Sequence, residues 1–134
     1  MKLLNLLLIA SIASSWVCAK EKFFVVEREN ESLATIYNGV KRANITGMHD
    51  MNHGVVKFDG KDGYAISRDG FVVKFDPESE KILAEYKTSK SAIGFVIGTN
   101  YVAVANYDDK SVDILDRDLK PLEKIQTGSK NVGI

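Results

Sequence analysis

The sequence predicts an all-β fold, a β-propeller built of four-stranded antiparallel blades. Three observations predict it. The segments after residue 22 are short runs of β-branched and aromatic residues, turn residues separate them, and related strand patterns return about every 40 residues. No apolar pattern of helical spacing and useful length follows residue 22. Residues 23–134 would then hold about two and three-quarter blades of such a propeller.

Turn chemistry marks the ends of the expected strands. Clusters of Asp, Gly, Asn, Pro and Ser separate them, as at 59–63, 76–79 and 98–100. The strand at 41–46 is more polar than the others. In chain order, the expected strands are 23–28, 33–37, 41–46, 55–58, 64–67, 71–75, 82–86, 93–97, 101–105, 112–115 and 122–125.

Internal repeats give the period of the fold. Residues 64–67 resemble 101–104 at an offset of 37, and residues 72–76 resemble 112–116 at an offset of 40. A period of about 40 residues with four strands is typical of a propeller blade. A β-sandwich is the alternative, but sandwiches rarely show a four-strand internal period, so the propeller is preferred.

The first 19 residues have the pattern of a secretory signal peptide. Lys2 gives a positive start, residues 3–13 form a mostly apolar run, and residues 17–19 supply small side chains before a cleavage site. A periplasmic location is therefore expected. Cleavage would remove Cys18, the only cysteine, so the mature chain would have neither a disulfide nor covalently attached c-type heme. An uncleaved membrane anchor and lipidation of Cys18 are the alternatives.

The charge balance points to no polyanionic partner. Lys plus Arg and Asp plus Glu both number 18. This balance gives no electrostatic argument for binding nucleic acid or a membrane surface. The one membrane contact left open is a lipid anchor at Cys18. The partner is therefore sought in local motifs.

Two features predict that residues 23–134 are the N-terminal part of a larger, truncated propeller. Residues 23–46 hold three strands, one short of a blade, and residues 131–134 stop where a further blade should begin. Propellers close with about four to eight blades, which would require roughly 330 to 400 residues here. The alternative is a short protein that oligomerises to cover its open edges.

The only two histidines, His49 and His53, lie in one segment, residues 47–54. Their i, i+4 spacing would suit a helical metal pair, but strands flank the segment and the glutamate of a zinc-protease motif is absent. Two solvated loop histidines are one interpretation. The segment would also join the first blade to the innermost strand of the second, beside the channel, where loops commonly bind ligands. An imidazole there suits the axial position of heme iron.

Two arginines occupy comparable places. Arg28 ends the first expected strand, and Arg68 begins the tight turn at 68–70. Guanidinium groups bind carboxylates in bidentate fashion, and heme-like tetrapyrroles carry several carboxylates. Solvated turn arginines are the alternative interpretation of both.

The ordered series of motifs resembles the heme d1 propeller family, which includes the heme d1 domain of cytochrome cd1 nitrite reductase and proteins of heme d1 biosynthesis. The series covers residues 23–134, and its members are Glu-Arg-Glu at 27–29, Asn-His-Gly at 52–54, Tyr-Ala-Ile-Ser-Arg-Asp-Gly at 64–70, Lys-Ser-Ala-Ile-Gly at 90–94 and Ala-Asn-Tyr at 105–107. The resemblance implies an eight-bladed propeller that holds heme d1 or its precursor over the channel.

The resemblance also implies roles for individual residues. His53 matches the axial ligand of the heme d1 iron, and Arg28 and Arg68 match positions near the cofactor carboxylates. Asn106 and Tyr107 match a pocket-lining segment. His49 has no clear counterpart in the family and is a secondary candidate for a metal ligand. The resemblance gives no catalytic residue.

One departure from cytochrome cd1 bears on function. The propeller motifs follow the signal peptide directly, with no c-type cytochrome domain between them, so nitrite reduction is not expected. The resemblance implies late heme d1 biosynthesis for nitrite reductase in denitrification, by binding a precursor and oxidising it or handing it on. Expected partners are the tetrapyrrole, other heme d1 maturation proteins and nitrite reductase. The alternative is a non-catalytic YncE-like scaffold for protein or peptide binding.

Overall fold

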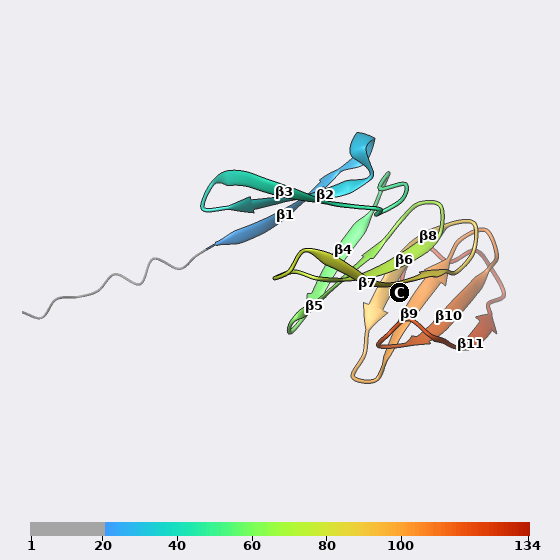
Figure 1. The fold of residues 1–134 in the computed structure, drawn as a ribbon. Coiled ribbons are helices and arrows are strands. Elements are labelled where there is room, and N and C mark those ends of the chain that lie inside the picture. Colours follow the sequence, from blue (N-terminus) through green and yellow to red (C-terminus); the bar gives the residue numbers. More distant parts are fainter. Residues whose placement is uncertain (1–20) are drawn as a thin grey trace, which may run out of the picture.

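The computed structural model describes residues 21–134, so the predicted signal peptide at 1–19 lies outside the described residues. The described chain forms three antiparallel sheets (Figure 1), which we call blades 1, 2 and 3. Blade 1 contains β1 (Lys22–Glu27), β2 (Ser32–Tyr37) and β3 (Val40–Thr46). Blade 2 contains β4 (Val55–Asp59), β5 (Asp62–Ile66), β6 (Phe71–Asp76) and β7 (Lys81–Lys87). Blade 3 contains β8 (Ala92–Ile97), β9 (Tyr101–Asn106), β10 (Ser111–Asp116) and β11 (Pro121–Gln126).

Each blade is a meander in which neighbours along the chain are also hydrogen-bonded neighbours. The two four-stranded antiparallel sheets and the three-stranded first sheet confirm the predicted all-β class. β4 and β8 are corresponding edge strands of blades 2 and 3. The strand predicted at 23–28 ends one residue early, because Arg28 is the first residue of a short 3-10 helix, η1 (Arg28–Asn30), that the sequence pattern did not predict.

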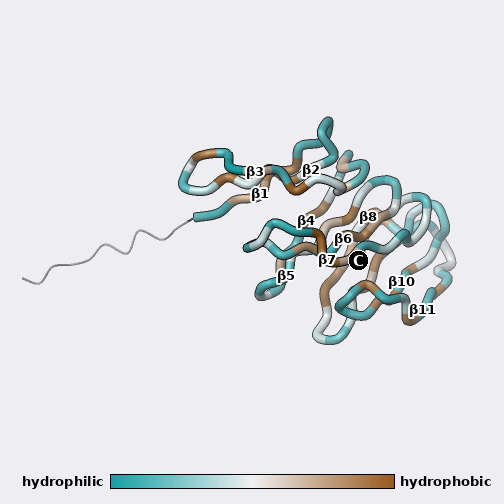
Figure 2. The backbone as a smooth tube through the Cα atoms, viewed as in Figure 1, coloured by the Kyte–Doolittle hydropathy of each residue, from teal (hydrophilic) through white to brown (hydrophobic). Residues whose placement is uncertain are grey.

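Apolar side chains fill the spaces between successive blades. In β5, Tyr64 and Ile66 belong to the core between blades 2 and 3, whereas Ala65, between them in sequence, belongs to the core between blades 1 and 2. This alternation follows from the two-residue period of a strand that is covered on both faces. Figure 2 shows hydrophobic stretches along the strands and mostly hydrophilic turns between them. Blade 2 is therefore packed on both sides.

Polar contacts add a second link between blades 2 and 3, at the end of the blades where β9 begins. The buried Tyr64 hydroxyl donates a hydrogen bond to the Arg117 carbonyl oxygen at 2.8 Å. The Arg117 guanidinium in turn reaches the Asp59 carboxylate at 2.7 Å and the Gly98 carbonyl oxygen at 2.7 Å. The Asp59 carboxylate raises the pKa of Arg117 above its ordinary value. These contacts hold the two blades in a fixed relation.

Within residues 21–134, no helix has the length and apolar character needed to cross a membrane.

Candidate functional site

The turns between the second and third strands of a four-stranded blade bear three of the predicted site residues at one equivalent position. In blade 3, Asn106 pairs with Ser111, and Tyr107 follows. In blade 2, the Ser67 amide bonds to the Phe71 carbonyl oxygen at 2.9 Å, and Arg68 follows. The corresponding pair in blade 1 is Glu27 with Ser32, and Arg28 follows. Arg28, Arg68 and Tyr107 are thus presented on the same face by three successive blades.

The linkers between blades dock on these turns through a repeated hydrogen bond. The Asp50 carbonyl oxygen, in linker 47–54, accepts the Arg68 amide at 2.7 Å. The Ser91 carbonyl oxygen, in linker 88–91, accepts the Tyr107 amide at 3.1 Å. Both linkers therefore lie against the turn of the blade that follows them. The first linker is the longer of the two, and it contains both histidines.

A tight turn at residues 51–54 projects His53 from the first linker. The Gly54 amide bonds to the Met51 carbonyl oxygen at 2.9 Å, and the Asn52 amide bonds to Asp50 Oδ1 at 2.9 Å. Met51 is buried in the core between blades 1 and 2, which fixes the base of the turn. His53 has a φ of 63°, in the left-handed region that histidine adopts more readily than most residues. Its side chain is consequently exposed above the start of β4.

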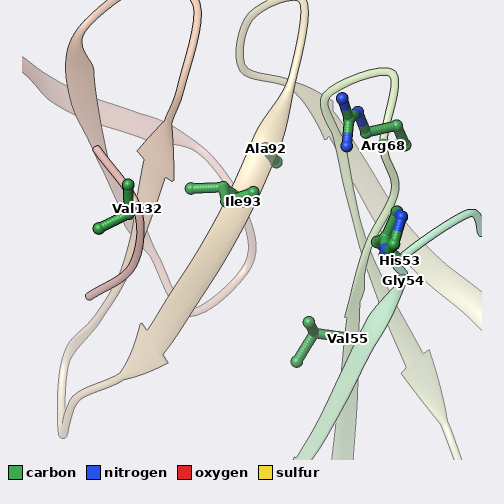
Figure 3. Close-up of a pocket in the computed structure, with 7 residues that line it drawn as sticks. All are labelled: His53, Gly54, Val55, Arg68, Ala92, Ile93 and Val132. Atoms are coloured by element: carbon green, nitrogen blue, oxygen red, sulfur yellow. The ribbon is translucent and has the colours of Figure 1, made fainter. Parts of the chain in front are cut away.

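His53 and Arg68 face one cavity of about 480 Å³ between blades 2 and 3 (Figure 3). They lie on the blade 2 side, whereas Ile93 and Val132 approach from the blade 3 side. Among the hydrogen bonds and ion pairs of residues 21–134, none involves the His53 imidazole or the Arg68 guanidinium. Both groups are therefore free to bind a ligand. The complete lining is His53, Gly54, Val55, Arg68, Ala92, Ile93 and Val132.

A smaller cavity of about 170 Å³ adjoins the first and is lined by Arg68, Ser91, Ile93 and Tyr107. The two cavities share Arg68 and Ile93, so Tyr107 lies at the edge of the same region. The Lys130 ammonium is 4.5 Å from the centre of the Tyr107 ring, which adds a positive charge on this side.

Asn106 lies elsewhere, contrary to the expectation that it lines the pocket. Its side chain is fully buried within blade 3, where its amide donates to Asp113 Oδ2 at 2.6 Å and to Ser111 Oγ at 3.2 Å. Asn106 is the last residue of β9, and the next residue, Tyr107, faces the cavity. Since successive side chains of a strand point in opposite directions, only one of the two could line the pocket.

His49 also lies outside both cavities. Its ring stacks on Phe71, with centroids 3.6 Å apart and an interplanar angle of 5°. Its Nε2 is 2.8 Å from Glu85 Oε2 on β7. The structure thus separates the two histidines, and His49 faces blade 2 rather than the cavity at His53.

Arg28 lines a different hollow, of about 420 Å³, together with Glu27, Glu29 and Asn30. The structure therefore does not bring Arg28 into the His53 cavity, although the two lie on the same face of adjacent blades. Hydrogen bonds from Lys41, first, and then from Asn30 and Asn44 lower the pKa of Glu27 from 4.5 to about 2. The Asn44 Nδ2 atom is 2.7 Å from Glu27 Oε2.

Because its pKa is lower in the folded chain, ionised Glu27 stabilises the fold above pH 4.5, and this stabilisation is lost as the pH falls toward 2. The Glu27→Gln variant should melt at a lower temperature than the wild type at pH 7, and the difference should shrink between pH 4.5 and pH 2. Melting curves of both proteins between pH 2 and pH 7 measure this difference in melting temperature. Glu29→Gln, at an exposed position of the adjacent helix η1, is the control. A difference that is constant with pH would contradict the prediction.

The apolar wall of the cavity is the part that motif reasoning missed. Val55 and Ile93 lie near the starts of the corresponding strands β4 and β8. The repeat itself carried this signal, because aligning the blades places both residues just after a linker. Ala92 and Ile93 lie within the motif at 90–94, which by itself gives them no binding role, and nothing in the sequence singles out Val132.

The model of the cytochrome D1 heme domain family matches residues 18–133. Among solved structures, dihydro-heme d1 dehydrogenase NirN in complex with DHE is 28% identical, with a TM-score of 0.69, and the match covers 78% of this chain and 24% of NirN. AztD from Citrobacter koseri is 14% identical over 82% of this chain and 33% of its own, with a TM-score of 0.67. The WD40 domain of Toxoplasma gondii coronin is 15% identical over 82% of this chain and 32% of its own, with a TM-score of 0.66.

The two more distant structures show the fold alone, and the WD40 domain among them confirms the β-propeller prediction. The chain spans about a quarter of the length of NirN and about a third of the other two. No curated protein matches the chain significantly.

Proposed function

Because the chain belongs to the cytochrome D1 heme domain family, we propose that it binds heme d1 or a heme d1 precursor in the cavity between blades 2 and 3, with His53 as axial ligand of the iron. One observation carries the proposal. The only described residues of this cavity with an ionisable side chain are His53 and Arg68, and neither has a partner within residues 21–134.

The chemistry of the cavity fits an iron tetrapyrrole. An imidazole nitrogen is a common axial ligand of heme iron, and a guanidinium pairs with a peripheral carboxylate. Val55, Ile93 and Val132 offer apolar surface for the face of the macrocycle. When bound, the tetrapyrrole would supply the redox-active iron, while these residues bind and orient it.

The repeated position of Arg28, Arg68 and Tyr107 extends this argument beyond one cavity. Successive blades of a propeller are related by rotation about the channel, so equivalent residues lie along an arc. A large ring with carboxylates on its periphery could meet Arg68 and, one blade away, Arg28. A small compact ligand would meet only the residues of the His53 cavity.

The finer proposal is a role in the periplasm like that of the heme d1 biosynthesis protein NirF. That role lies late in the synthesis of heme d1, the cofactor of nitrite reductase in denitrification. The relative NirN is a dihydro-heme d1 dehydrogenase solved with DHE, which supports a biosynthetic intermediate as ligand. The signal-peptide pattern at 1–19 supports export. The protein would receive the precursor, oxidise it or hand it on, and so meet other maturation proteins and nitrite reductase.

A spectral titration of the full chain with heme d1 tests the proposal. We expect a saturable shift of the Soret band with one ligand per chain and a Kd of about 1 µM or lower. The iron-free macrocycle is the control, and it should bind more weakly because it lacks the bond to His53. An unchanged Soret band at excess heme d1 would contradict the proposal and favour a scaffold for protein or peptide binding.

A further inference from the structure

We propose that His49 is a positioning residue, which holds the 51–54 turn so that His53 faces the ligand cavity. The inference rests on the proposed function for its biological meaning, but its structural basis is independent of any ligand. His49 lies four residues before His53 in linker 47–54, lines neither cavity, and makes two side-chain contacts with blade 2.

Those two contacts fix His49 in both distance and orientation. The near-parallel stack on Phe71, with centroids 3.6 Å apart, holds the plane of the imidazole. The 2.8 Å contact from Nε2 to Glu85 Oε2 fixes its rotation within that plane. Lys87 Nζ lies 4.3 Å from the centre of the Phe71 ring, so the aromatic side chain is itself held in place.

Comparison of the blades shows why blade 2 accepts a side chain from the linker. Strand register makes Glu85 equivalent to Asn44 in blade 1 and Lys124 in blade 3. Asn44 bonds to Ser32 of its own blade, whereas Lys124 pairs with Asp113 of its own blade and also donates to the Thr88 carbonyl oxygen of linker 88–91 at 3.1 Å.

Blade 2 differs because Phe71 replaces the serine found at the equivalent position in the other two blades. Glu85 therefore lacks the serine partner that Asn44 has in blade 1, and among residues 21–134 its carboxylate pairs with His49 instead. In blades 2 and 3 this position of the outer strand therefore contacts the preceding linker, and in blade 2 the linker supplies the side chain of His49.

The anchor is transmitted to His53 through Asp50, the residue next to His49. The Asp50 carbonyl oxygen accepts the Arg68 amide at 2.7 Å, its amide donates to Asp69 Oδ1 at 3.3 Å, and its side chain accepts the Asn52 amide at 2.9 Å. His49 and His53 both have a φ of 63°. Non-glycine residues in this region cost about 1 kcal/mol or more each, so the linker keeps this shape only while its contacts hold it.

Hydrogen exchange of the ligand-free chain tests the anchor directly. In His49→Ala, the amides of Asn52 and Gly54 should exchange at least about tenfold faster than in the wild type, because the turn they close is released. The Tyr107 amide makes the equivalent bond to Ser91 one blade away, and it should not change. Unchanged exchange at Gly54 would overturn the inference.

Two further variants keep the test informative if His49→Ala does not fold. His49→Phe keeps the stack on Phe71 and loses the contact with Glu85, so it should speed exchange at Gly54 by less than His49→Ala. Glu85→Gln keeps a hydrogen-bond acceptor for His49 and should behave as the wild type. If Gly54 exchanges as fast in His49→Phe as in His49→Ala, the stack on Phe71 does not hold the turn. That result would overturn the stacking part of the inference.

Titration with heme d1 then separates this inference from the proposed function. His49→Ala should bind about tenfold more weakly, as residues that support a metal ligand typically do, while the saturated complex keeps the wild-type Soret spectrum because His53 still binds the iron. Failure of the wild type to bind heme d1 would refute the proposed function and leave the exchange result standing. A changed Soret spectrum in saturated His49→Ala would mean that His49 itself binds the iron, and would overturn the positioning role.

Discussion

Replacing His53 with alanine should weaken the binding of heme d1 by more than about 100-fold. Residues that only support a metal ligand already contribute about 10- to 100-fold to affinity, so loss of the ligand itself should exceed that range. The Soret spectrum of any residual complex should also change, because the iron would lose its protein nitrogen. The measurement is a spectral titration of wild type and variant under the same conditions.

His53→Asn is the matched control for the backbone. Asparagine adopts the left-handed region about as readily as histidine, so this variant keeps the φ of 63° while removing the imidazole. His53→Asn should keep the wild-type melting temperature closely, since His53 is exposed and its side chain has no partner within residues 21–134. Added imidazole should restore part of the spectrum of His53→Ala. Wild-type affinity in both variants would show that His53 is not the ligand.

Arg68 should behave differently from His53 in the same titration. Its guanidinium would pair with a carboxylate rather than with iron, so its loss would lower affinity and leave the spectrum of the saturated complex unchanged. The two residues share one cavity but would make separable contributions. This difference distinguishes an iron tetrapyrrole from an anionic ligand that lacks a metal.

The blades were predictable because their signal is repeated and local. The related patterns at 72–76 and 112–116 both form third strands, β6 and β10, as their alternating apolar residues predict. The turn residues at 59–63 and 98–100 likewise mark hairpins that the structure contains. A signal that recurs in each blade is difficult to misread.

The site was less predictable because it depends on single-residue boundaries and on contacts between blades. Moving the end of β9 by one residue exchanges Asn106 and Tyr107 between the interior and the cavity. Nothing local to the 47–54 segment shows that His49 pairs with Glu85, which lies 36 residues further along the chain. Motif spacing gave the candidates, and the packing of the linkers separated them.

The linkers therefore both connect the blades and help to form the candidate site. Each linker leaves the outer strand of one blade, contacts the turn of the next blade, and enters that blade's first strand. The walls of the His53 cavity are the turn and linker residues with the start of β4 on one side, and the start of β8 with Val132 on the other. A change that moves linker 88–91 against the turn at 67–70 should therefore disturb stability and binding together.

Gly70→Ala is such a change, and it should lower the free energy of unfolding by about 3 kcal/mol. Gly70 has a φ of 91°, and a Cβ added there would lie 2.3 Å from the carbonyl oxygen of Ser89 in linker 88–91. That atom belongs to the backbone and cannot rotate away, so the turn and the linker must separate. Overpacking of this kind costs about 1–3 kcal/mol, and the left-handed conformation adds about 1 kcal/mol for alanine.

The control is Gly39→Ala, which has a comparable φ of 76° but no atom within 4 Å of the added Cβ. It should lose only the backbone part, about 1 kcal/mol. Urea denaturation measures both, and the difference between them isolates the collision with Ser89. Because Gly70 also accepts the Thr88 amide at 2.9 Å, separation would move Arg68 and Ile93 apart, so Gly70→Ala should bind heme d1 more weakly while Gly39→Ala binds as the wild type. Equal losses of stability in the two variants would show that the turn can move without cost, and that it does not fix the width of the cavity.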